Sequence, residues 1–250
     1  NRDNLSRLRT IPKAVFPTKG FSFYGLFDAE ADGYVTAGIN EKGLVVVNAA
    51  VNSVPREKRF VATEDLTYRL LTSFDSADAV ILQQTIFQRS HPAIYIIGDS
   101  FKIMSVEIAP AGKYSVAVRR EGFLGFTNHY TAADLLCENK LASNGSLQRL
   151  QRLRTLVSGR ASPYTLDDFV NIGNDTAGGT EASLWRVSKG SESIRTLAGW
   201  VVHVPPEGHP SLYVRIANES EPEITRTIKI DPSFWKKEKV DNTADFKSNF

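Results

Sequence analysis

The chain is poor in the residues that build disulfide frameworks, metal centres and membrane spans. It has one cysteine, Cys137, and four histidines among 250 residues. One cysteine excludes an intramolecular disulfide framework and a zinc site made of several cysteines. No apolar run is long enough to be interpreted as a membrane span. The histidines lack the spacing of metal ligands, so the sequence predicts neither a metal nor a cofactor.

An excess of charge of one sign is also missing. The formal net charge is +2, and no long basic run occurs. Arg149, Arg152 and Arg154 lie among leucines at helical spacing, which is more typical of a solvated helix face than of a nucleic-acid patch. We therefore expect no nucleic-acid partner.

What is present is enough apolar sequence for one large core. Residues 1–250 are interpreted as a single domain, because no repeat and no long linker divides them. Strands are predicted at 20–27, 34–39, 44–47, 93–97, 102–108, 114–118, 123–127, 197–204 and 211–216. Helices are predicted at 63–71, 76–87, 146–157 and 165–172, with a glycine-rich loop at 178–179 and a loosely packed tail after Asp231. Strands and helices alternate in groups, which favours an α+β fold with helices layered on antiparallel sheets.

The segment from Gly122 to His129 is an apolar run that ends on an amide and an imidazole. Two interpretations of Asn128 stay open. It donates a hydrogen bond to an oxyanion from the end of a strand, or it caps the helical-looking segment at 131–134. His129, taken alone, is more often structural than catalytic. Neither a Gly-x-Ser-x-Gly turn nor a phosphate loop is present.

Five segments in this order carry a family resemblance: Asn1-Arg2-Asp3, Gly38–Leu44, Asp99–Glu107, Thr127–Tyr130 and Ser146-x-x-Arg149. The chain resembles, from Asn1 to about Ile216, the N-terminal-nucleophile (Ntn) amidohydrolases of the choloylglycine hydrolase, penicillin V acylase and acyl-coenzyme A:6-aminopenicillanic-acid acyltransferase type. The resemblance implies a four-layer αββα sandwich. It also implies a cysteine nucleophile whose own α-amino group accepts the proton.

The resemblance also implies roles for individual residues. Asp3 matches the aspartate that holds the amino group of the nucleophile, Asn128 matches an oxyanion-hole asparagine, and Arg149 matches the arginine that orients the site. Asn48 lies close to a second oxyanion-hole position, which the alignment gives to Ala50. No cofactor is implied.

The nucleophile itself is the main departure from the family pattern. The family's cysteine precedes the aspartate by about eighteen residues, and only two residues precede Asp3 here. Cys137 follows the Thr-Asn-His segment on a predicted helix, so we interpret it as a small buried thiol. We expect the nucleophile on an N-terminal segment outside this chain, either cleaved separately or simply not included here. A sheet without that strand would leave an unpaired edge in the site.

The predicted function is therefore cleavage or transfer at the linear carbon–nitrogen bond of a small N-acylated compound. The alternative is a catalytically silent relative that binds an acyl ligand or a partner. Phe21, Phe23, Tyr24 and Phe27 either line an acyl pocket or belong to the core. The short connection from Tyr130 to Gly145 weakens the inference of the family's tetramer, although a homo-oligomer stays open. A secreted, periplasmic or lysosome-like compartment is slightly favoured over the cytoplasm.

Overall fold

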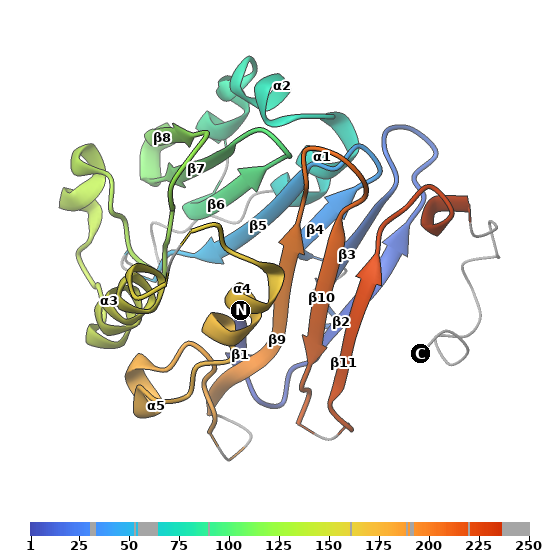
Figure 1. The fold of residues 1–250 in the computed structure, drawn as a ribbon. Helices are drawn as coiled ribbons and strands as arrows, with labels where there is room; N and C mark the ends of the chain where they lie inside the picture. The colour runs from blue at the N-terminus through green and yellow to red at the C-terminus, as the bar shows by residue number, and fades with distance from the viewer. Residues whose placement is uncertain are drawn as a thin grey trace.

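The computed structural model describes residues 1–30, 34–52, 54, 65–89, 91–160, 162–188, 190, 193–219 and 221–236. Within these ranges the strands form two antiparallel sheets. The larger has the order β2-β3-β4-β5-β6-β7-β8, and the smaller has the order β1-β9-β10-β11. In Figure 1 the orange and red strands β9 to β11 lie across the blue strands of the larger sheet.

The larger sheet follows the chain without crossovers. Its strands are β2 (Thr10–Val15), β3 (Phe23–Asp28), β4 (Val35–Asn40), β5 (Val45–Ala50), β6 (Ala93–Gly98), β7 (Ile103–Ile108) and β8 (Tyr114–Arg119). The smaller sheet joins the start of the described chain to its later part, with β1 (Arg2–Leu5), β9 (Ile194–His203), β10 (Ser211–Ile216) and β11 (Ile224–Lys229). Of these strands, β1, β2 and β11 are not predicted from the sequence, because their apolar alternation is weak or interrupted by charge.

Helices cover the outer face of each sheet. Against the larger sheet lie α1 (Leu66–Ser73), α2 (Ala77–Ile81) and the 3₁₀ turns η2 (Gln84–Arg89) and η3 (Pro110–Gly112). On the side of the smaller sheet lie α3 (Asn144–Ser158), α4 (Leu166–Gly173) and the short α5 (Gly179–Ala182), with α4 packed on β9 and β10. The result is the predicted α+β sandwich of four layers, helix, sheet, sheet, helix (Figure 1).

Two apolar layers hold the sandwich together. One fills the space between the larger sheet and α1 and α2, and it includes Phe23, Phe27, Leu70 and Leu71. The other fills the space between the sheets, where Tyr24 stacks on Trp200 with ring centroids 5.9 Å apart. The aromatic residues of β3 are therefore core residues, which decides against the acyl-pocket interpretation for Phe23, Tyr24 and Phe27.

Several predicted boundaries are wrong or fall outside the described residues. The helix predicted at 76–87 is divided into α2 and η2, and the glycine-rich loop contains α5. The start predicted at Thr63 lies outside the described residues, and α1 begins after Asp65, whose side chain accepts from the backbone N–H of Tyr68. The tail packs as far as η5 (Phe234–Lys236), where Phe234 contacts the ring of Tyr24 edge-on; residues 237–250 lie outside the described residues.

The strand predicted at 123–127 does not form. Residues 123–127 have no regular secondary structure and pair with neither sheet, and η4 (Ala133–Glu138) follows them. Phe126 packs instead against the buried cluster around Tyr130, whose hydroxyl donates to the carbonyl of Ile108. The apolar pattern thus reflects partial burial and does not indicate hydrogen bonding within a sheet.

Candidate functional site

Asn128 is held at four of its polar atoms. Its backbone N–H donates to Ser146 Oγ at 2.9 Å, and its backbone carbonyl accepts from the N–H of Asn52 at 3.0 Å. Its side-chain Oδ1 accepts from Arg149 Nη2 at 2.9 Å, and its Nδ2 donates to the carbonyl of Ala50 at 2.9 Å. Asn128 therefore has a fixed position between the end of β5 and the first turns of α3.

These partners also fix the direction of the Asn128 amide. A guanidinium has only donors, so the atom that faces Arg149 must be the amide oxygen. The nitrogen then faces the carbonyl of Ala50, which can only accept. An amide nitrogen carries two hydrogens, and the Ala50 carbonyl takes one of them. The second N–H of Asn128 can serve as the donor that an oxyanion hole needs.

Arg149 is a buried cation on the inner face of α3. Its side chain links Asn128 to the carbonyl of Glu181 at 3.3 Å, and the residue is 8% exposed. The pKa of Arg149 is lowered, mainly by burial. The nearby charges have smaller effects on this pKa: the carboxylates of Asp3 and Glu181 raise it, and the guanidinium of Arg186 lowers it. Asp3, Arg186 and Glu181 thus all lie within electrostatic range of Arg149. An arginine keeps its charge through such a shift, so the site holds a permanent cation.

Asp3 reaches the same site from the smaller sheet. Arg2 and Asn4 both donate to the carboxylate of Asp28, so Asp3, between them on the strand, points to the opposite face. There its Oδ1 accepts from Thr196 Oγ1 at 2.7 Å, and its Oδ2 lies 3.8 Å from Arg186 Nη1. The register of β1 and β9 shifts between Arg2 and Asp3, which sets Thr196 opposite Asp3.

Asn48 does not belong to this group. Its amide donates to Thr67 Oγ1 at 2.7 Å and to the carbonyl of Val35 at 3.0 Å, and so ties β5 to α1 and β4. Its neighbour Tyr34 has its pKa raised to about 12, mainly by burial. The structure brings together Asp3, Asn128 and Arg149, but it places Asn48 in a buried polar cluster between the sheet and α1. The backbone of Ala50, two residues later, is what reaches Asn128.

Cys137 is exposed, so its interpretation as a buried thiol is wrong. It lies on η4, where Leu135 turns inward to the cluster around Tyr130 and Cys137 faces outward. On the short η4, a residue two positions after the buried Leu135 can face solvent. Nothing in the sequence indicates which residue of η4 faces the core. No described contact joins Cys137 to Asn128 or Arg149.

Three residues of the site are not among the sequence-predicted site residues. Ser146 accepts from Asn128, Thr196 donates to Asp3, and Arg186 adds a second guanidinium. Ser146 had a signal, since it begins the Ser146-x-x-Arg149 pattern and residues three apart share a helix face. Thr196 and Arg186 had none, because a register shift and a loop position bring them to Asp3.

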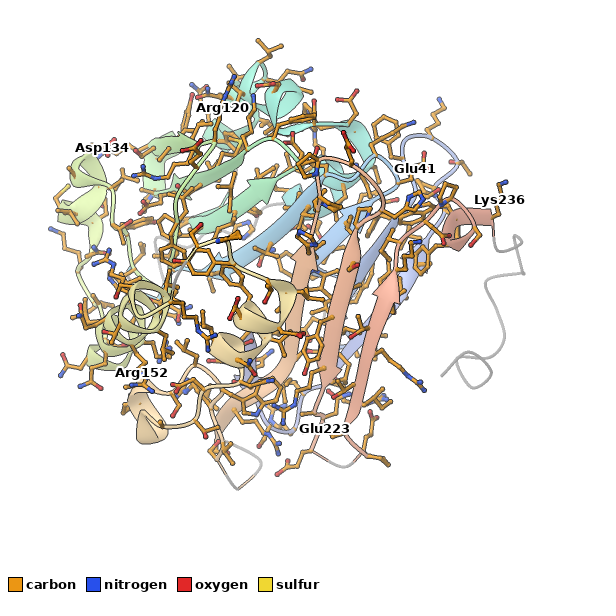
Figure 2. The ribbon with its side chains drawn as sticks, in the orientation of Figure 1. Glu41, Arg120, Asp134, Arg152, Glu223 and Lys236 are labelled. Carbon is orange, nitrogen blue, oxygen red and sulfur yellow. The ribbon has the colours of Figure 1, made fainter. Side chains whose placement is uncertain are left out.

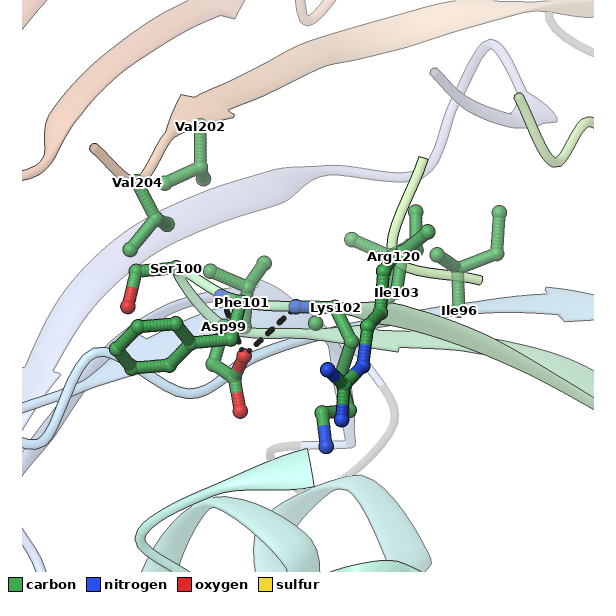
Figure 3. Close-up of a pocket in the computed structure, with 12 residues that line it drawn as sticks. Ile96, Asp99, Ser100, Phe101, Lys102, Ile103, Arg120, Val202 and Val204 are labelled. Carbon is green, nitrogen blue, oxygen red and sulfur yellow. Dashed lines mark hydrogen bonds between the residues drawn. The ribbon is translucent and has the colours of Figure 1, made fainter. Parts of the chain in front are cut away.

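A crevice opens elsewhere between the sheets, at the other end of β5 (Figure 3). It has a volume of about 300 Å³. Its apolar lining comes from Val45, Val47, Ile96, Phe101, Ile103, Val202 and Val204, and Ser100, Lys102 and Arg120 add polar groups. Asp99 closes the hairpin at its rim by accepting from the N–H groups of Phe101 and Lys102. The amine of Lys102 is paired with Asp78. The crevice thus shares β5 with the Asn128 site without sharing any of its charged residues.

The outer faces of the molecule carry ordinary ion pairs. Figure 2 shows Arg152 in the helical layer and Glu223 near the foot of β11. Arg152 makes two hydrogen bonds to Asp175, at 2.6 and 3.1 Å, and Arg215 makes two to Glu223.

Among the described residues, no group of three or more His, Cys, Asp or Glu side chains is placed to hold a metal ion. Nor does any helix in those ranges have the length and apolar character to cross a membrane.

Two solved structures show the same fold. A variant of conjugated bile acid hydrolase from Clostridium perfringens is 14% identical, with a TM-score of 0.53 over 90% of this chain and 84% of that chain. Penicillin V acylase from Agrobacterium tumefaciens is 15% identical, with a TM-score of 0.54 over 89% of this chain and 77% of that chain. A search of curated proteins gave no significant match.

The sequence profile of one family matches almost the whole described chain. It is the profile of acyl-coenzyme A:6-aminopenicillanic acid acyl-transferase, and it matches residues 1–219. The match takes in Asp3, Asn128 and Arg149, the three predicted residues that the fold brings together. The chain belongs to the acyl-coenzyme A:6-aminopenicillanic acid acyl-transferase family and has the Ntn-hydrolase fold.

Proposed function

We propose that this protein cleaves, or transfers the acyl group of, a linear amide in a small N-acylated compound. The observation that carries the proposal is the geometry of Asn128, whose amide is oriented by Arg149 and Ala50 and retains one N–H for a ligand. Such a donor stabilises the negative charge that develops on an amide oxygen during acyl transfer. Membership of the acyl-transferase family supports the same reaction class.

The proposed nucleophile is a cysteine on a segment that precedes Asn1. Its thiolate adds to the amide carbonyl, a carbon–sulfur bond forms, and the amine leaves with a proton as the carbon–nitrogen bond breaks. Water or a second amine then attacks the thioester and releases the acyl group. The position of Asp3 within electrostatic range of the buried Arg149 suits a role in holding the amino group of such a residue.

The edge of β9 supports this assignment. Residues Gly199 to His203 pair with β10 on one side, and no described strand pairs with their other side. The register Arg2↔Ala198 would carry residues upstream of Arg2 along this edge. A strand there would satisfy the free backbone groups and lie beside Val202 and Val204, which line the crevice. We therefore do not assign a ligand to the crevice.

The test uses the protein produced from its natural gene and a panel of N-acyl amino acids, conjugated bile salts, penicillin V and N-acyl homoserine lactones. We expect release of the amine from at least one compound, and loss of that activity after alkylation with iodoacetamide. Peptide mapping by mass spectrometry should find an alkylated thiol in addition to the exposed Cys137, and Cys137→Ser should retain both full turnover and the loss of activity on alkylation. Absence of turnover with Cys137 as the only labelled thiol would instead favour a silent acyl-binding relative.

A further inference from the structure

Ser146 is the point at which the whole Thr127-Asn128-His129 segment meets α3. Thr127 Oγ1 donates to the Ser146 carbonyl at 2.9 Å, and the N–H of Asn128 donates to Ser146 Oγ at 2.9 Å. His129 Nδ1 lies 2.8 Å from the same hydroxyl oxygen. Ser146 is 1% exposed, so no water competes for these bonds.

The burial of Ser146 also decides what it does not do. A serine hydroxyl beside a histidine nitrogen resembles the pair used in nucleophilic catalysis. A nucleophile must reach a substrate carbonyl, and this hydroxyl is enclosed by Thr127, Asn128 and His129. Ser146 therefore supports the structure of the site and does not act as a nucleophile.

Ser146 and Arg149 are spaced so that both contact Asn128 from the same face of α3. Residues three apart on a helix lie on one face, about one turn apart. Ser146 holds the backbone nitrogen of Asn128, and Arg149 holds its side-chain oxygen at the same distance of 2.9 Å. One turn of α3 thus fixes both the main chain and the side chain of Asn128.

We propose that Ser146 is a positioning residue for the Asn128 amide, acting through the backbone N–H of Asn128. The expected loss of turnover rests on the proposed function. The expected movement of Asn128 does not. Without the Ser146 hydroxyl, the backbone of Asn128 loses its partner in α3, whereas the bond to Arg149 persists. The free N–H of the amide then moves relative to the position that a developing oxyanion occupies, and a small displacement of such a donor is costly.

The test compares Ser146→Ala with Ser143→Ala in the full natural chain. Ser143 caps the same helix by accepting from the N–H of Ser146, and it makes no described contact with Asn128. We expect Ser146→Ala to lower kcat by about tenfold or more with KM changed less than about threefold. Ser143→Ala should leave turnover within about twofold while lowering the midpoint of thermal unfolding.

A double-mutant cycle shows whether Ser146 acts through Asn128. If it does, Asn128→Ala with Ser146→Ala should be no slower than Asn128→Ala alone, within about twofold. If the fold losses in kcat of the two single variants multiply in the double variant, Ser146 does not act through Asn128 and the proposal is overturned. If Ser146→Ala fails to fold, Ser146→Cys takes its place in the same cycle. Its thiol is slightly larger than the hydroxyl and a weaker acceptor, so we expect a smaller loss of turnover.

Hydrogen exchange gives a readout that needs no substrate. The backbone N–H of Asn128 should exchange at least tenfold faster in Ser146→Ala than in the unaltered protein, and at an unchanged rate in Ser143→Ala. Faster exchange without any measurable turnover in the unaltered protein would sink the proposed function and keep the positioning role. Unchanged exchange at Asn128 would remove the positioning role whatever the activity is.

Discussion

Arg149 sets the direction of the Asn128 amide by donating from Nη2 to Oδ1 over 2.9 Å. The bond runs from a buried cation on α3 to a residue that precedes η4, and it bridges two parts of the chain 21 residues apart. Because a guanidinium cannot accept, the amide has one permitted orientation. This orientation leaves one N–H of the Asn128 amide free to donate to a ligand.

Removing the Asn128 amide should reduce turnover more than it reduces stability. We expect Asn128→Ala to lower kcat by about two to three orders of magnitude, the cost of losing one oxyanion donor. The matched control is Asn48→Ala, which deletes an amide that ties β5 to Thr67 and Val35. This control should lower the denaturation midpoint and leave kcat within severalfold. A change of less than severalfold in Asn128→Ala would show that Asn128 does not donate to the oxyanion.

Arg149 and Arg152, which both lie on α3, should respond differently to the same substitution. Arg149→Lys places a single ammonium where a planar fork linked Asn128 to the carbonyl of Glu181, so we expect kcat to fall by at least about tenfold. Arg152→Lys changes a partly exposed pair with Asp175 and should shift the midpoint of urea unfolding only slightly. Steady-state kinetics and urea unfolding on both variants make the comparison. Equal kinetic losses would argue against a special role for Arg149.

Thr196 should matter through Asp3. Thr196→Val keeps the shape of this fully buried side chain and removes the hydroxyl that donates to Asp3 Oδ1 and accepts from the N–H of Arg186. We expect a loss of about 1.5–3 kcal/mol in unfolding free energy, the range for a hydrogen bond to a charged group. Urea unfolding measures it. If Thr196→Val and Asp3→Asn together cost as much as the two separate losses added, the two residues do not act as a pair.

Acid should weaken the fold through His129. Burial lowers the pKa of His129, and Arg154 and Arg149 lower it further. The unfolded chain then binds a proton more readily, so stability is fully present above about pH 6.5 and falls as the pH drops below it toward the folded-state pKa. Burial lowers the pKa of His91 as well, and it contributes in the same direction.

The variant that isolates this effect is His129→Gln, which retains a hydrogen-bonding side chain that does not titrate. Its unfolding free energy should decline less between about pH 7 and pH 5 than that of the unaltered protein, as measured by urea unfolding at each pH. His203→Gln is the control, because His203 is exposed at the end of β9. Parallel pH profiles for all three proteins would mean that His129 is not the group responsible.

The helices of the site were predictable because their signals are local. The buried face and the leucine spacing of α3 place it within two residues of its predicted start, and Thr165 caps α4 where the sequence predicts that helix to begin. The same spacing puts Ser146 and Arg149 on one face. Strand β5 was predictable for a similar reason, since its run of valines suits a strand covered on both sides.

The segment before Asn128 was mispredicted because apolar periodicity reports burial and not hydrogen-bond partners. Residues 123–127 are covered by neighbouring elements, but their backbone pairs with no strand. Asn48 illustrates the same limit. Its chemistry is that of an oxyanion donor, and only its neighbours Thr67 and Val35 show that the amide is already occupied.

The sequence by itself indicated the fold class, through the grouping of its strands and helices, because those patterns are local. It singled out Asp3, Asn128 and Arg149 only through the order of five segments shared with a family, since each of these residues is a weak signal when taken alone. Only the tertiary structure decided that Thr196 and Arg186 hold Asp3, that Ser146 holds Asn128, and that Asn48 lies elsewhere. Those outcomes depend on a strand register and on contacts between residues far apart in the chain, and the free energy that selects them arises only when the sheets and helices pack together.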